Sequence, residues 1–72
     1  MTDHSFDAEK FNSEVRKFLK KVGITSQIEL EAAVRAALAK GLDPAKPLLA
    51  RIVLQVEGLD LRHEIEQELQ LS

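Results

Sequence analysis

The sequence predicts a small α+β domain in which a two-helix antiparallel hairpin packs on a two- or three-stranded antiparallel β-sheet. Two observations support this fold. The N-terminal half carries two runs of apolar residues at helical spacing, each followed by a glycine. The segment around Glu57-Gly58 carries apolar and polar residues that mirror each other outward from the glycine, as in a β-hairpin. With 72 residues, the chain is expected to form one domain over 1–72.

The composition limits how this fold can be stabilised. The hydrophobic fraction of 44% is typical of a folded protein, but a domain of this size buries little of its surface. There is no cysteine, so neither a disulfide nor a thiolate ligand for zinc is available. The predicted core must therefore suffice alone, or self-association must extend it.

The first helix is expected over about 7–22. Asp7 is a candidate N-cap, and Phe6 before it could pack as a hydrophobic staple. Gly23 stands where a glycine commonly ends a helix. The residues of its apolar stripe are Phe11, Val15, Phe18, Leu19 and Val22.

The second helix is expected over about 26–40. Ser26 and Glu29 have the spacing of a capping box, and Gly41 follows as the helix stop. Its apolar face is formed by Leu30, Ala33, Val34, Ala37 and Leu38. Because about three residues join the two helices, they are expected to pack antiparallel, with the alanines allowing close approach. A loop containing two prolines follows over 41–47.

The β-hairpin is expected over about 48–65, with a two-residue turn at Glu57-Gly58. The predicted cross-strand pairs are Val56–Leu59, Leu54–Leu61, Ile52–His63 and Ala50–Ile65 on one face, and Gln55–Asp60, Val53–Arg62 and Arg51–Glu64 on the other. The first face is almost entirely apolar, whereas the second is polar and contains one pair of opposite charges.

The last residues allow two interpretations. A second turn at Glu66-Gln67 would be followed by a short third strand over 68–71. Alternatively, Leu61, Ile65 and Leu69 have helical spacing and Asp60 could cap a third helix over 60–70, which would make the domain a three-helix, all-α fold. Strands are favoured because a single hairpin register pairs apolar residues on one face and polar residues on the other.

Three segments of the chain, FN..VRKFLK.VG.TSQ, AVR.AL and VEGLDL, resemble a family of short bacterial proteins known only as a domain of unknown function. The resemblance extends from about Phe11 to Leu71. It implies strands near the C-terminus and a bacterial, cytoplasmic setting, but it implies no activity, cofactor or site. Gln67 stands where relatives carry a glycine suited to a turn, which weakens the case for a second turn here.

No set of residues in the sequence predicts catalysis, and neither a cofactor nor a metal site is expected. His4 lies near the N-terminus and is expected to be solvated, while His63 falls on the apolar face of the hairpin and is expected to be structural. Glu64, Glu66 and Glu68 alternate along one strand and are expected to form a solvated acidic face. The chain is therefore expected not to be an enzyme.

The charge distribution gives the candidate binding residues. Residues 8–23 carry five basic groups and two acidic ones, whereas residues 48–72 carry two basic groups and five acidic ones. The candidate contacts to nucleic acid or another anion are Lys10, Arg16, Lys17, Lys20 and Lys21. A helix-turn-helix is disfavoured, because Glu29 and Glu31 would repel DNA at the start of the second helix.

The leading hypothesis is a cytoplasmic, non-catalytic protein-interaction module that forms a homodimer through its small core and open sheet edge. The alternative is a nucleic-acid-binding accessory protein that uses the basic first helix. No membrane partner is expected, because no apolar run is long enough to span a bilayer and no signal-peptide segment is recognised.

Overall fold

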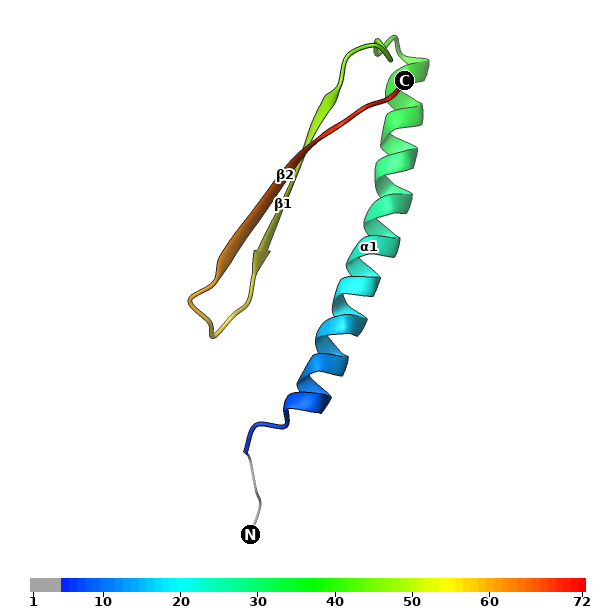
Figure 1. The fold of residues 1–72 in the computed structure, drawn as a ribbon. Helices are drawn as coiled ribbons and strands as arrows, with labels where there is room; N and C mark the ends of the chain where they lie inside the picture. Colours follow the sequence, from blue (N-terminus) through cyan, green and yellow to red (C-terminus); the bar gives the residue numbers. More distant parts are fainter. Residues whose placement is uncertain (1–4) are drawn as a thin grey trace. The chain divides into compact units, whose positions relative to one another are not determined.

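The computed structural model describes residues 5–72 and contains one helix, α1 (Ala8–Ala39), and one antiparallel sheet of two strands, β1 (Leu48–Gln55) and β2 (Arg62–Leu69) (Figure 1). The α+β class is therefore confirmed. The helix and the hairpin belong to two compact units, which meet in the sequence between Ala37 and Leu38. His4 lies outside the described residues.

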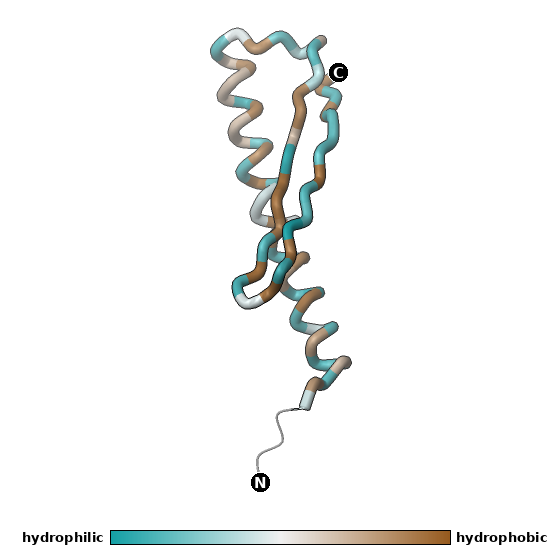
Figure 2. Tube along the Cα trace, turned by 90° about the vertical axis from the view of Figure 1, so that its left-hand side faces the viewer, coloured by the Kyte–Doolittle hydropathy of each residue, from teal (hydrophilic) through white to brown (hydrophobic). Residues whose placement is uncertain are grey.

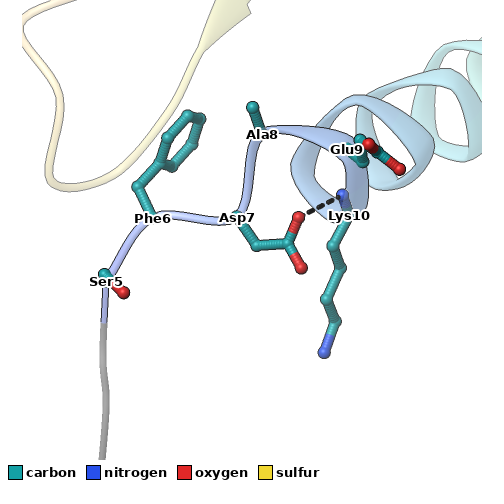
Figure 3. Close-up of a pocket in the computed structure, with 6 residues that line it drawn as sticks. All are labelled: Ser5, Phe6, Asp7, Ala8, Glu9 and Lys10. Atoms are coloured by element: carbon teal, nitrogen blue, oxygen red, sulfur yellow. Dashed lines mark hydrogen bonds between the residues drawn. The ribbon is translucent and has the colours of Figure 1, made fainter.

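The start of α1 contains both of the features predicted for it, the N-cap and the hydrophobic staple. The Lys10 amide donates a hydrogen bond to Asp7 Oδ1 at 3.1 Å, so Asp7 caps one of the amides that have no partner within the helix (Figure 3). The rings of Phe6 and Phe11 lie with their centroids 5.6 Å apart. These residues flank the cap at the positions of a hydrophobic staple, which holds the chain at its entry into the helix.

The prediction of two helices is wrong, because α1 runs without interruption through Gly23, Ile24 and Thr25. Gly23 does not adopt a positive φ, so it does not form a helix stop. Thr25 Oγ1 donates to the Lys21 carbonyl at 2.7 Å, a bond that a threonine makes inside a helix. A glycine costs a helix only about 1 kcal/mol relative to alanine, and the good helix formers on either side outweigh that cost.

The second predicted helix stop is confirmed. Gly41 has a φ of 107°, and its amide donates to the Leu38 carbonyl at 3.1 Å. The next loop is organised by Asp43, whose Oδ1 accepts a bond of 2.9 Å from the Ala45 amide. Gly41 and Gly23 therefore differ in the residues on their C-terminal side. Asp43 and Pro44 make a turn after Gly41, whereas no such turn residues come after Gly23.

The turn at Glu57-Gly58 is confirmed, but the strand register differs from the predicted one by two residues. The Leu59 amide donates to the Val56 carbonyl at 3.1 Å, and Gly58 has a φ of 89°, as the third residue of a type II turn requires. Pairing begins only at Gln55 and Arg62. The observed pairs are Leu48–Leu69, Leu49–Glu68, Ala50–Gln67, Arg51–Glu66, Ile52–Ile65, Val53–Glu64, Leu54–His63 and Gln55–Arg62.

A shift of two residues keeps every side chain on its predicted face, because the strand repeat is also two residues. The shift replaces Ile52–His63 by Ile52–Ile65 and Arg51–Glu64 by Arg51–Glu66. Both replacements improve the pairing. The first joins two β-branched apolar residues, and the second joins two opposite charges while leaving Glu64 to contact Arg62 on its own strand.

The second turn and the third strand are wrong predictions. β2 continues through Glu66 and Gln67 to Leu69, and β1 and β2 are the only strands among residues 5–72. A helix over 60–70 is wrong as well. Ser72 Oγ donates to the Pro44 carbonyl at 3.0 Å, which holds the end of the chain against the loop before β1.

Candidate interaction surface

Apolar residues from both predicted helices line up along one side of α1, although the sequence suggested two separate faces. Phe11, Val22 and Ala33 follow one another at intervals of eleven residues, which is close to three helical turns, so they lie along one line of the helix. We call the residues Phe11, Val15, Phe18, Leu19 and Val22 the N-terminal stripe. We call the residues Leu30, Ala33, Val34, Ala37 and Leu38 the C-terminal stripe.

Neither stripe is buried. Phe11 is 54% exposed and Phe18 is 50% exposed, and only Val15, Val22, Val34 and Ala37 of the ten stripe residues are half-buried. More broadly, no residue among 5–72 is buried. The described chain thus has the apolar residues of a core, but those residues remain in contact with solvent.

The hairpin also presents an apolar face. Leu48, Ala50, Ile52 and Leu54 of β1 share this face with Ile65 and Leu69 of β2. In Figure 2, β1 is mostly hydrophobic and β2 mostly hydrophilic, so β1 supplies most of the apolar surface of the sheet. Ile52 and Ile65, which face each other, are 44% and 50% exposed. A two-stranded sheet with one open apolar face is only marginally stable by itself.

The opposite face of the hairpin is charged. Arg51 donates to Glu66 Oε2 through Nε at 2.8 Å and through Nη2 at 2.5 Å. On the same face, Arg62 Nη2 lies 3.3 Å from Glu64 Oε2. Two of the three glutamates predicted to form a solvated acidic face, Glu64 and Glu66, are therefore paired with arginines.

The five basic candidates all lie on α1 and are exposed. Lys10, Lys17 and Lys21 recur at intervals of seven and four residues, so they line one side of the helix. Arg16 and Lys20 lie elsewhere on its circumference. Lys17 Nζ is 3.3 Å from Glu14 Oε2, which partly neutralises this row of cations. The structure therefore brings three of the five candidates together along one side.

Two further apolar residues, Ile24 and Ile28, are 52% and 61% exposed and lie off both stripes of α1. The sequence places Ile28 at the margin of the apolar face of the second predicted helix, and Ile24 just past Gly23. The prediction missed that they share one side of a continuous helix, and their spacing of four residues is the signal for it.

No arrangement for metal binding is present among residues 5–72, where no three His, Cys, Asp or Glu side chains cluster. His63 is exposed and lies opposite Leu54 on the apolar face of the hairpin. An open depression at the start of α1 is lined by residues 5–10 (Figure 3). One of its polar groups, the Asp7 carboxylate, accepts the Lys10 amide in the helix cap. No helix in the part of the chain that the structure describes is long and apolar enough to cross a membrane.

Over residues 5–72 these features define a small α+β protein with one helix, one β-hairpin and exposed apolar faces on both. The chain belongs to a family of unknown function, DUF6494, whose family model matches residues 6–72. The resemblance to an uncharacterised domain family is thereby confirmed. Searches of curated proteins and of solved structures found no match to the chain.

Proposed function

We propose that this chain is a non-catalytic protein-interaction module of the bacterial cytoplasm that acts as a homodimer. One observation carries the proposal: no residue among 5–72 is buried, although both stripes of α1 and one face of the hairpin are apolar. Removing apolar surface from water contributes about 25 cal/mol per Å². A second copy of the chain can cover these faces and supply the stability that a chain without cysteine cannot gain from disulfides.

The length of α1 also supports this proposal. A helix of 32 residues is about 48 Å long, so its two stripes offer a long apolar surface to a second chain.

The experiment that tests the proposal is the molar mass in solution by light scattering, combined with far-ultraviolet circular dichroism over a dilution series. We expect a dimer at micromolar concentration, and we expect helix content to fall as the dimer dissociates. A monomer that keeps its full helix content on dilution contradicts the proposal. Measurements at low and high salt separate an apolar interface, which is insensitive to salt, from one held by charge.

A second candidate function is supported by the row formed by Lys10, Lys17 and Lys21 along one side of α1. Such a row could contact successive phosphates of a nucleic acid, with Arg16 and Lys20 adding charge beside it. Filter binding with a single-stranded RNA and a DNA duplex tests this function. The affinity should fall steeply with salt, and a variant with glutamine at positions 10, 17 and 21 should lose it. Absence of binding at low salt contradicts it.

A further inference from the structure

The two stripes of α1 match each other in size, but one chain cannot bring them together. In an antiparallel alignment about residue 24, Phe11 and Val15 of the N-terminal stripe face the small residues Ala37 and Ala33 of the C-terminal stripe, and Phe18 faces Leu30. Bulky side chains opposite alanines allow two helices to pack closely without voids. Within the continuous α1, however, Phe11 and Ala37 are 26 residues apart, which is about 39 Å along the axis.

The charges of α1 favour one orientation of two such helices. Residues 8–23 carry a net charge of +3, from five basic and two acidic groups. Residues 24–39 carry a net charge of −1, from two acidic groups and one basic group. Two parallel helices would place the +3 segments side by side, whereas two antiparallel helices place each of them beside a segment of opposite sign.

We propose that α1 of one copy packs antiparallel on α1 of a second copy, with the N-terminal stripe of each helix on the C-terminal stripe of the other. This inference rests on the proposed homodimer and specifies its interface. The two-fold axis passes close to residue 24, so that Phe11 lies opposite Ala37 and Val15 lies opposite Ala33 of the second copy. Each contact then occurs twice, as the symmetry of a dimer requires.

The same pairing explains why the sequence predicts a helical hairpin. The two stripes are complementary, and that complementarity indicates packing between them. Because Gly23 lies inside a continuous helix, the packing takes place between two copies and not within one. In the antiparallel pair the two stripes still pack on each other, as predicted. The two-fold axis lies near residue 24, where the sequence predicts a turn.

Disulfide trapping can test this arrangement, because the chain contains no cysteine of its own. Two single variants, Val15→Cys and Ala33→Cys, are prepared, one with a mass tag, and oxidised separately and as a mixture. In the proposed pair, position 15 of one copy lies opposite position 33 of the other. The two cysteines are then within the Cα separation of about 7 Å that a disulfide tolerates. In either variant alone, the two cysteines are about 27 Å apart along the axis.

We expect a cross-linked heterodimer in the mixture and little cross-linking in either variant alone. The matched control is a mixture of Lys17→Cys and Glu31→Cys. These two control sites lie level with each other across the proposed pair, as the two test sites do. Each is two residues along its helix from the nearest test site, which puts it on the far side of the helix. The control mixture should therefore remain largely uncross-linked. Circular dichroism of the reduced variants establishes that each of them is folded.

Each result has a distinct meaning. Efficient cross-linking of each single variant with itself indicates parallel helices and overturns the inference. A dimer by light scattering that gives no more heterodimer in the test mixture than in the control mixture also overturns it, because the two stripes then do not meet as proposed. A monomer by light scattering overturns the inference together with the proposed function.

Discussion

Arg51 and Glu66 face each other across β1 and β2, and two nitrogens of the guanidinium contact one carboxylate oxygen of Glu66. This pair reports the strand register, because the register predicted from the sequence places Arg51 opposite Glu64. The side chains of Arg51 and Glu66 are 56% and 43% exposed. Solvent therefore screens their attraction, and an exposed pair of this kind contributes no more than about 1 kcal/mol.

A double-mutant cycle should detect this register. Arg51→Ala and Glu66→Ala are expected to be coupled by about 0.2–1 kcal/mol, whereas Arg51→Ala and Glu64→Ala are expected to be coupled more weakly. The measurement is the free energy of unfolding in urea for the single and double variants, at one fixed protein concentration. Stronger coupling with Glu64 than with Glu66 would show that the hairpin pairs in the register predicted from the sequence.

The N-cap of α1 gives a second prediction. Asp7→Ala removes the acceptor of the Lys10 amide and is expected to destabilise the protein by about 1 kcal/mol. Asp7→Ser keeps an oxygen at this position and should retain most of the stability. Thermal unfolding followed by circular dichroism at 222 nm measures both variants. Equal losses for alanine and serine would mean that the capping bond does not stabilise the helix.

Gly23 gives a third prediction, in which the sign of the effect separates one helix from two. Its φ is not positive, and a Cβ placed on it meets nothing within 4 Å. Gly23→Ala is therefore expected to stabilise the protein by about 0.5–1 kcal/mol. Gly41→Ala is the matched control. The φ of 107° at Gly41 strains any residue with a Cβ, and a loss of about 1–2 kcal/mol is expected. Destabilisation by Gly23→Ala would favour the helical hairpin.

The comparison of Gly23 with Gly41 also shows what the sequence could predict. Local signals gave correct predictions where neighbouring residues supported them, as at Asp7 with Phe6 and at Gly41 before the Asp43 turn. The signal at Gly23 failed because it had no such support. A glycine followed by a capping-box pattern resembles a helix end, but a long helix tolerates both features at a small cost. The interval of eleven residues between Phe11, Val22 and Ala33 was the evidence for a single helix.

The register error has a different cause. Apolar alternation determines which face a side chain occupies, but it cannot distinguish two registers that differ by two residues. The choice between them depends on the conformation of residues 56–61, where Gly58 alone gives a clear local signal. For the candidate surface, the sequence identified the stripes and the five basic residues. The prediction divided the stripes between two helices, although the interval of eleven residues indicated one.

The proposed antiparallel pair leads to a last prediction, which concerns Glu29. This residue lies eleven positions after Phe18 and therefore borders the same face of α1. In the proposed pair, Glu29 lies opposite Leu19 of the second copy and beside segment 8–23 of that copy, which carries a net charge of +3. Glu29→Lys should weaken dimerisation about tenfold, because it replaces an attraction by a repulsion at two symmetric sites.

A neutral variant separates loss of the attraction from the added repulsion. Glu29→Gln should weaken dimerisation less than Glu29→Lys does, because it removes the attraction to the basic segment without adding a repulsion. Glu31→Lys is the control, because it makes the same change in net charge as Glu29→Lys on the far side of the helix. Sedimentation equilibrium at low salt gives the dissociation constants of all four proteins. If Glu29→Lys and Glu31→Lys weaken the dimer equally, then net charge alone accounts for the effect and Glu29 does not lie at the interface with a second copy.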